Sequence, residues 1–199
     1  MVAGVLLDYG QLRDHRVRPL ACLNDSKQVA PEEREELFRA VVGCASRVSV
    51  QVISPGEIDR EGLHRSNLAG LRRALTALAP PAEVCLVDGF RLGPRAPEHL
   101  AVVDGDEHSA AIAAASIVAK VTRDRYMRRA HALYPAFGFA SHVGYITPAH
   151  SKVVRERGPS EIHRRSFQAL CYLSEEELAA LAPLADAGSR PAEPGSAGA

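Results

Sequence analysis

The chain has 199 residues, of which 46% are hydrophobic, and its 24 Lys and Arg are balanced by 24 Asp and Glu. This length fits one domain with its own core, and the balanced charge excludes a disordered polyelectrolyte and a protein that coats nucleic acid by bulk charge. No apolar run could span a bilayer, and residues 1–7 lack the basic lead of a secretion signal, so we expect a soluble, cytoplasmic protein without membrane contact.

Predicted strands and helices alternate through the first part of the chain. The apolar run at 2–7 predicts a buried strand, and Pro31 begins a helix with acids in its first turn and one apolar stripe. Residues 47–53 alternate between apolar and polar, which is typical of a half-buried strand ending at a Ser-Pro-Gly turn. Leucines recur every three to four residues from 68 to 78, which predicts a second helix.

Two short apolar strands then end in acidic residues. Residues 84–87 lead to Asp88, and residues 100–103 lead to Asp104-Gly105-Asp106. The next helix begins near Ser109, is apolar nearly all round, and becomes basic from Lys120 onward. The alternation of strands and helices predicts an α/β fold with a mixed sheet flanked by helices.

The last third is predicted to be mainly loop and helix. Residues 134–148 have a loop-like composition rich in aromatics, and a short helix follows from Thr147-Pro148 to Gly158. A capping box at 174–177 predicts a last helix, and Ala, Gly, Ser and Pro dominate thereafter. We therefore expect one domain at 1–185 and a disordered tail at 186–199.

Asp88 and Asp106 are the first candidate functional residues. Each follows a short strand, and ligands of open α/β sheets collect outside the carboxyl ends of strands. Carboxylates fixed there suit a hard cation such as Mg²⁺. The alternative is that each Asp-Gly pair only forms a turn.

A local positive charge is the second signal. Between Lys120 and Arg165 there are ten Lys or Arg against three acids, a surplus of 10 − 3 = +7, and Tyr145 is one of several interleaved aromatics. This pattern suits a phosphate backbone with a base stacked on it, and the basic helix segment at 120–129 would supply phosphate contacts. The alternative is a solvated helix face beside a loop that packs on its own aromatics.

Two smaller polar groups could also hold a phosphate. The turn Asn24-Asp25-Ser26-Lys27 precedes a helix and offers backbone amides and the Lys27 ammonium, or it only caps that helix. His163 and Arg164 could flank a phosphate or be ordinary surface charge.

Taken together, these motifs resemble those of the ribonuclease HII family, which cuts the RNA strand of RNA/DNA hybrids and single ribonucleotides in duplex DNA. The resemblance runs from Val2 to about Leu170. It rests on ordered matches at 23–27, 87–89, 104–106, 112–124, 134–135, 138–139, 142–145, 158–160 and 162–167.

The resemblance implies a ribonuclease H-like sheet with a helical C-terminal part, and a Mg²⁺ or Mn²⁺ cofactor. Asp88 and Asp106 would be catalytic, metal-binding carboxylates, and water activated by the metal would leave 5′-phosphate and 3′-hydroxyl ends. Tyr145 would stack at the junction between ribonucleotide and deoxyribonucleotide. The other nucleic-acid contacts would be Lys27, Ser116, Lys120, His163 and Arg164.

One departure from the family pattern concerns the start of the chain. The family opens with a strand ending in Asp-Glu-x-Gly-Arg-Gly, which supplies two further carboxylates, and nothing here matches it. We therefore expect that the first strand is missing and that this chain, a monomer, binds hybrid weakly and cleaves it poorly. The alternative is a truncated or catalytically dead hybrid-binding protein.

Overall fold

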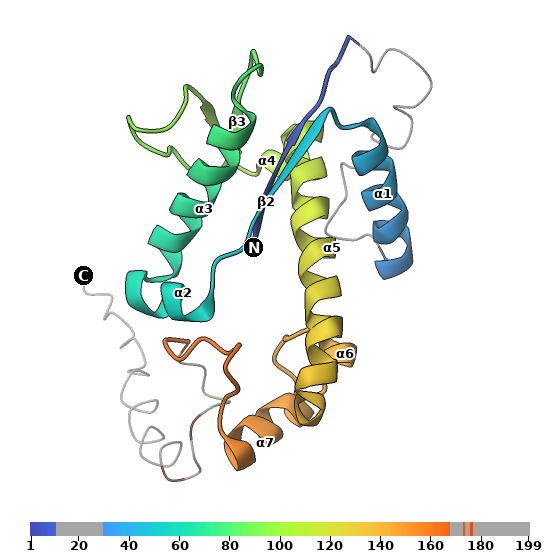
Figure 1. The fold of residues 1–199 in the computed structure, drawn as a ribbon, viewed down its shortest axis with the longest axis vertical. Coiled ribbons are helices and arrows are strands. Elements are labelled where there is room, and N and C mark those ends of the chain that lie inside the picture. The colour runs from blue at the N-terminus through green and yellow to red at the C-terminus, as the bar shows by residue number, and fades with distance from the viewer. Residues whose placement is uncertain (11–29, 168–172, 174–175, 177–199) are drawn as a thin grey trace, which may run out of the picture.

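The computed structural model describes residues 1–10, 30–167, 173 and 176 (Figure 1). Lys27, the helix expected from 174 and the tail expected at 186–199 lie outside the described residues. The elements are β1 (Val2–Leu6), α1 (Pro31–Cys44), β2 (Arg47–Gln51), α2 (Pro55–Glu61), α3 (Leu63–Leu78), β3 (Leu86–Asp88), β4 (Leu100–Val102), α4 (Gly105–His108), α5 (Ala110–Leu133), η3 (Pro135–Phe137), α6 (Phe139–His142) and α7 (Pro148–Arg157).

The strands form two separate pairs. β1 runs antiparallel to β2, with Val2 opposite Gln51, and β3 runs parallel to β4, with Asp88 opposite Val102. The expectation of one mixed sheet is therefore wrong in this respect: both pairings occur, but as two two-stranded sheets. The physical reason is that a cavity lies between β1 and β3, and no strand among the described residues bridges it.

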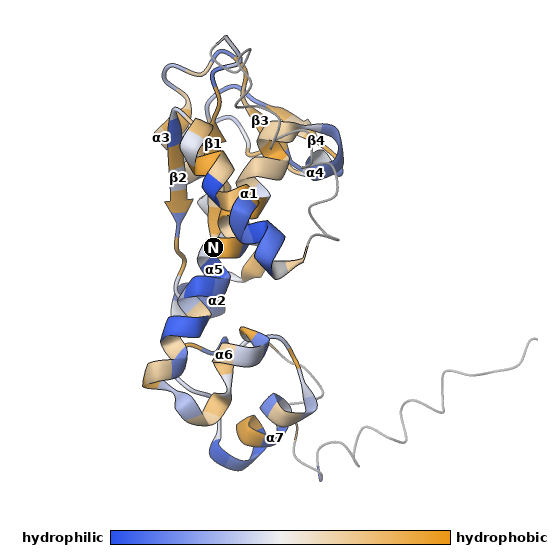
Figure 2. Cartoon of the chain, turned by 90° about the vertical axis from the view of Figure 1, so that its right-hand side faces the viewer, coloured by the Kyte–Doolittle hydropathy of each residue, from blue (hydrophilic) through white to orange (hydrophobic). Residues whose placement is uncertain are grey.

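The long helix α5 is the centre of the main core. Its Ala113, Ala114, Ile117 and Val118 are almost fully buried, because β1 and α1 cover different sides of the helix. α1 contributes Leu37 and Val41 to this core, and it turns hydrophilic residues outward (Figure 2). The apolar composition that α5 has nearly all round is thus explained by its central position.

Helix α3 covers the other side of β1. A Cβ at Gly4 would lie 2.7 Å from Leu78 Cδ1, and a Cβ at Gly70 would lie 2.9 Å from Val2 Cγ2. These glycines allow strand and helix to approach each other closely.

α2, which precedes α3, was not predicted. Ser54-Pro55-Gly56 begins a helix rather than only a turn, because Ser54 Oγ accepts a hydrogen bond from Glu57 N.

The C-terminal part of the described chain packs around the end of α5. Residues 134–148, expected as loop, contain the short helices η3 and α6, which are held together by the buried side chain of Phe139. α7 begins as predicted, with Thr147 Oγ1 accepting from His150 N and Pro148 in the first turn. This part lies below the sheets, at the opposite end of α5 from β3 (Figure 1).

Candidate active site and nucleic-acid interface

The two strand-end acids lie at the same edge of the β3–β4 sheet. Gly105 N donates a hydrogen bond of 3.0 Å to Asp88 Oδ1, so the turn that carries Asp106 rests against the Asp88 carboxylate. Asp104 makes this turn possible by adopting a left-handed conformation with φ of 48°. A Cβ on Gly105 would lie 2.5 Å from Ile112 Cδ1, so a larger residue there would push the acids apart.

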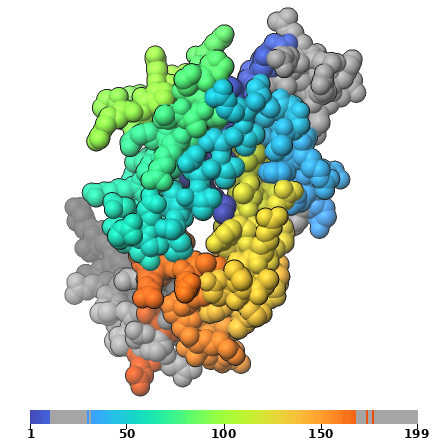
Figure 3. All heavy atoms as spheres, viewed as in Figure 1, coloured from blue at the N-terminus to red at the C-terminus, as the bar shows by residue number. Residues whose placement is uncertain are grey.

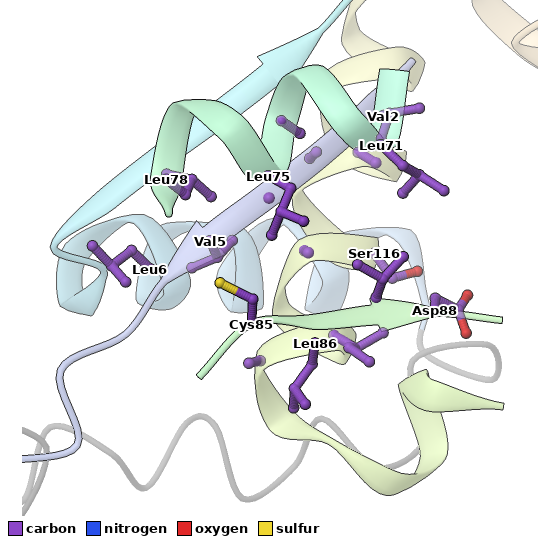
Figure 4. Close-up of a pocket in the computed structure, with 18 of the residues that line it drawn as sticks. Val2, Val5, Leu6, Leu71, Leu75, Leu78, Cys85, Leu86, Asp88 and Ser116 are labelled. Atoms are coloured by element: carbon purple, nitrogen blue, oxygen red, sulfur yellow. The ribbon is translucent and has the colours of Figure 1, made fainter. Parts of the chain in front are cut away.

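An apolar cavity extends from Asp88 between the two sheets. Its volume is about 310 Å³, and β1, β3, α3 and α5 line it. β1 and β3 run in opposite senses along it, and Ser116 of α5 lies at the same end as Asp88 (Figure 4). Of the residues expected at the groove, Ser116 is thus close to Asp88, and both are exposed to solvent at this end.

The donor set at this edge fits one divalent ion. Carboxylate oxygens are the ligands that Mg²⁺ and Mn²⁺ prefer, and Mg²⁺ commonly binds through one or two carboxylates together with waters and substrate phosphates. A two-ion cage needs more anionic oxygens. Among residues 1–10 and 30–167, no group of three or more His, Cys, Asp or Glu side chains could hold a metal.

Tyr145 lies on the side of α5, against two cations. Its hydroxyl accepts a 2.6 Å hydrogen bond from Lys120 Nζ, which also lies 4.5 Å from the ring centroid, and the Arg123 guanidinium lies 5.2 Å from it. The side chain is nevertheless 53% exposed. The surface therefore offers a flat aromatic ring between two positive charges, which is what a nucleotide base and its phosphates can bind.

A buried carboxylate fixes these cations. Asp124, 6% exposed, accepts from Lys120 Nζ and Arg123 Nη1 at 3.3 Å each, and Arg34 of α1 lies 3.8 Å away. A buried carboxylate is stable only when it is paired, and here three cations share it. Asp124 thus holds the ends of Lys120 and Arg123 toward Tyr145.

Arg164 lies in the segment after α7, where its guanidinium is 4.8 Å from the Phe167 ring. Burial, and then the charges of Arg123 and Arg164, hold the pKa of the Met1 α-amino group below its usual value of 8.0. In Figure 3 the dark blue start of the chain lies at a hollow between the cyan α2, the yellow α5 and the orange segment after α7. Lys120, Arg123 and Tyr145 are hereafter called the basic aromatic surface.

Two further arginines of α5 lie against α1. Arg125 forms a short ion pair with Glu35 of α1 and lies 4.3 Å from the Phe38 ring, and Arg128 Nη1 is 4.0 Å from Glu35 Oε1. The hydrogen bond from Arg125 lowers the pKa of Glu35. The helix turns these two arginines toward α1 and not toward Tyr145, and the expectation that the whole segment 120–129 supplies phosphate contacts stays a prediction.

His163 belongs to a row of histidines instead of the exposed surface. Its Nε2 lies 3.0 Å from His150 Nε2, and His150 Nδ1 lies 3.2 Å from His142 Nδ1.

Asp59 of α2 is a residue that the sequence analysis did not single out. Its carboxylate accepts hydrogen bonds from Arg165 N, Ser166 N and Ser166 Oγ. These bonds lower the Asp59 pKa and tie the segment carrying Arg164 to α2. No local pattern could have indicated Asp59, because its partners lie more than 100 residues away.

Comparisons with solved structures define the class of fold. The ribonuclease H2 of Pyrococcus horikoshii OT3 superposes with a TM-score of 0.65 and 25% identity, covering 81% of this chain and 83% of that one. A Bst-RNase HIII in complex with Mn²⁺ gives a TM-score of 0.65 at 18% identity, over 89% of this chain and 63% of that one. The fold is therefore ribonuclease H-like: a mixed α/β arrangement of helices and small sheets.

Sequence comparisons give the family. The family model described as Ribonuclease HII matches residues 1–170, and the chain belongs to this family. It is 44% identical over 167 residues to a ribonuclease HII of Parafrankia sp. (strain EAN1pec), covering 84% of this chain and 68% of that protein. It is 42% identical over 184 residues to a ribonuclease HII of Mycobacterium sp. (strain JLS), covering 92% of this chain and 75% of that protein.

The chain spans little more than half the length of several relatives. Against the ribonuclease HII of Salinispora tropica it is 48% identical over 145 residues, which are 73% of this chain but 54% of that protein. Among the described helices, none combines the length and hydropathy needed to cross a bilayer.

Proposed function

We propose that this site serves an endonuclease that hydrolyses the RNA strand of RNA/DNA hybrids and cuts at single ribonucleotides in duplex DNA. The observation that carries the proposal is the hydrogen bond that holds the Asp106 turn on Asp88, in a chain of the ribonuclease HII family. The basic aromatic surface beside α5 supports it, since it suits a phosphate backbone and a stacked base.

The chemistry assigned to the acids is metal-assisted hydrolysis of a phosphodiester. Asp88 and Asp106 would hold Mg²⁺ or Mn²⁺, which when bound would activate water and neutralise charge on the phosphate. The water oxygen bonds to phosphorus, and the bond from phosphorus to the 3′ oxygen breaks. The departing 3′ oxygen takes up a proton, so the products are a 5′-phosphate and a 3′-hydroxyl.

The other assigned residues would bind and orient the substrate. Tyr145 would stack on the sugar or base at the junction, and Lys120 beside its ring and Arg164 of the segment after α7 would contact phosphates. Ser116 would contact the strand nearest Asp88. His163 would position Arg164 from the neighbouring residue, and Lys27 stays a prediction from the sequence. We also propose that the protein acts as a monomer in the cytoplasm.

A cleavage assay of the 199-residue chain tests this function. The substrate is a labelled DNA duplex with one ribonucleotide, incubated with Mg²⁺ or Mn²⁺, and an all-DNA duplex is the control. We expect slow cleavage at the ribonucleotide, because two carboxylates are fewer oxygen ligands than a two-ion site needs. If the chain cleaves neither the single-ribonucleotide duplex nor a long hybrid, the endonuclease assignment is refuted.

A hybrid-binding protein without catalysis is the second candidate. It is favoured by the finding that, in the described part of the chain, Asp88 and Asp106 are not joined by a third metal-ligating side chain. Binding of the same duplex in Ca²⁺, measured by fluorescence anisotropy, together with no cleavage in Mg²⁺ or Mn²⁺, would support this candidate.

A further inference from the structure

Three histidines from consecutive segments form a continuous row of hydrogen bonds. His142 ends α6, His150 lies in the first turns of α7, and His163 lies in the segment after α7. Their facing nitrogens are 3.2 Å apart between His142 and His150, and 3.0 Å apart between His150 and His163. The row packs against the buried ring of Phe139, and His150 is 3% exposed.

The first end of the row determines where every proton lies. His142 Nε2 is 2.8 Å from the Phe137 carbonyl oxygen, which can only accept, so Nε2 carries the hydrogen. His142 Nδ1 is then an acceptor, shared by Gly144 N at 3.1 Å and His150 Nδ1. His150 Nδ1 must therefore carry its hydrogen, which leaves His150 Nε2 as the acceptor for His163 Nε2–H.

The second end of the row gives the same answer independently. The remaining nitrogen, His163 Nδ1, must be an acceptor, and it lies 3.0 Å from Ser160 N, a backbone donor that cannot accept. Ser160 Oγ, at 2.8 Å, can also donate to it. The two fixed ends, a carbonyl and an amide N–H, thus agree on one set of three neutral tautomers.

The row is connected to Tyr145 through the turn between α6 and α7. Tyr145 N donates a 2.8 Å hydrogen bond to the His142 carbonyl oxygen, and Gly144 N donates a hydrogen bond to His142 Nδ1. Val143 and Gly144 both have positive φ, at 44° and 82°, so the turn has an unusual shape that these two hydrogen bonds must hold. Nothing in the turn other than this histidine anchors Gly144 N.

We propose that His142, His150 and His163 form a neutral chain of hydrogen bonds in one direction, from Ser160 N to the Phe137 carbonyl, and that this chain positions Tyr145 on the basic aromatic surface. The tautomers rest on geometry alone, whereas the positioning role rests on the proposed function of Tyr145. His150 is the central positioning residue, because it is the only ring bonded to both others.

The surroundings of the row favour its neutral state. Burial, and then repulsion by His142 and His163, lowers the pKa of His150 from 6.5 to about 4, and burial also lowers that of His163. Two charged side chains lie beside residues that pack on the row: Arg123 Nη2 would be 3.3 Å from a Cβ at Gly144, and Glu161 accepts a hydrogen bond from Tyr134, whose ring contacts that of Phe139. A second proton on any ring would place an N–H against another N–H.

The tautomers are tested by long-range ¹H–¹⁵N NMR of the uniformly ¹⁵N-labelled full chain near pH 7.5. We expect Nε2–H for His142 and His163 and Nδ1–H for His150, with all three rings neutral. Any other tautomer pattern, or a charged ring in the row at this pH, would overturn the proposal. This measurement needs no substrate and no activity.

The positioning role is tested with His150→Asn, because the shorter amide side chain cannot bridge His142 and His163 as the ring does. The matched control is His64→Asn, an exposed histidine of α3 outside the row. We expect His150→Asn to remove the NOEs between the Tyr145 ring and Lys120, and to weaken hybrid binding in Ca²⁺ roughly tenfold, the same loss that we expect for Tyr145→Ala. In the double variant the two losses should not add.

The outcomes separate this inference from the proposed function. Unchanged NOEs and unchanged hybrid affinity in His150→Asn, with a loss in Tyr145→Ala, would overturn the positioning role and leave the function standing. If Tyr145→Ala itself leaves affinity unchanged, the nucleic-acid role of Tyr145 fails and the positioning role fails with it. The tautomer spectrum then still decides whether the chain of hydrogen bonds exists.

Discussion

The sheet edge at Asp88 and the histidine row at the far end of α5 are held together in different ways. In the row, every ring nitrogen has a matching donor or acceptor over 27 residues, from Phe137 to His163, around a buried phenylalanine. At the sheet edge, residues from β1, β3, α3 and α5 surround an apolar cavity of about 310 Å³. The row fixes positions by local hydrogen bonds, whereas the edge depends on distant segments that leave space between them.

This contrast separates what each region controls. In the proposed function the carboxylates at the edge would carry out the chemistry, and the row would support the aromatic ring that binds the substrate. Changes at the edge should alter turnover with little effect on affinity, and changes around the row should do the reverse.

The largest effect is expected for Asp88→Asn. Loss of a ligand charge should lower the cleavage rate by at least about a thousandfold, because a bound metal contributes several kcal/mol to the transition state. Stability should be equal or slightly higher, since the amide oxygen can still accept from Gly105 N and a negative charge near Asp106 is removed. Single-turnover cleavage and thermal denaturation measure the two effects.

Asp104→Asn is the matched control for this substitution. Asp104 is exposed and lies in the same turn, with φ of 48°. Asp104→Asn is the same chemical change as Asp88→Asn, and Asn adopts this left-handed conformation without strain. Its cleavage rate should stay within a few-fold of the unsubstituted chain. Equal losses in both variants would mean that the turn, and not the Asp88 charge, is what matters.

Two truncations compare the packing of the regions. Phe139→Ala should cost about 3–5 kcal/mol, because the ring is 1% exposed and packs on all three histidines of the row. Leu86→Ala, at the wall of the cavity, should cost less than about 2 kcal/mol, since its contacts are already incomplete. Urea denaturation of both variants tests the order, and the reverse order would refute the contrast in packing.

The proton content of the row should also make stability depend on pH. The His150 pKa is about 4 in the folded protein against 6.5 ordinarily, so between these values the unfolded chain binds more protons and stability rises with pH. Lowering the pH from 7 to 5 should therefore cost about 2 kcal/mol. The pKa of Glu35 is lowered from an ordinary value of 4.5, so this carboxylate stays ionised across the window, whereas the lowered pKa values of His163 and the Met1 amine change stability in the same direction as that of His150.

His150→Asn provides the reference for the pH effect. Urea denaturation of this variant at pH 7 and pH 5 should show a clearly smaller difference, whereas His64→Asn should keep the full difference. An unchanged pH dependence in His150→Asn would assign the effect to groups outside the row.

The sequence indicated local features better than long-range ones. The start of α1, the end of α3 and both ends of α7 followed from caps and apolar spacing, and the strands leading to Asp88 and Asp106 followed from short apolar runs. The split of the sheet could not be predicted, because it depends on how β1 and β3 are placed across the cavity. The histidine row was missed because its bonds depend on a turn with two positive φ angles, which no spacing rule indicates.

The smallest expected effect distinguishes the two sides of α5. Arg123 lies over the Tyr145 ring, and Arg128 lies 45% exposed beside Glu35. If only the Tyr145 side meets the phosphate backbone, Arg123→Ala should weaken hybrid binding and reduce the slope of log affinity against log salt by about one, whereas Arg128→Ala should change neither appreciably. Anisotropy titrations in Ca²⁺ at several salt concentrations measure both slopes. A reduced slope in Arg128→Ala would extend the interface onto the α1 side of the helix, where Glu35 now neutralises that arginine.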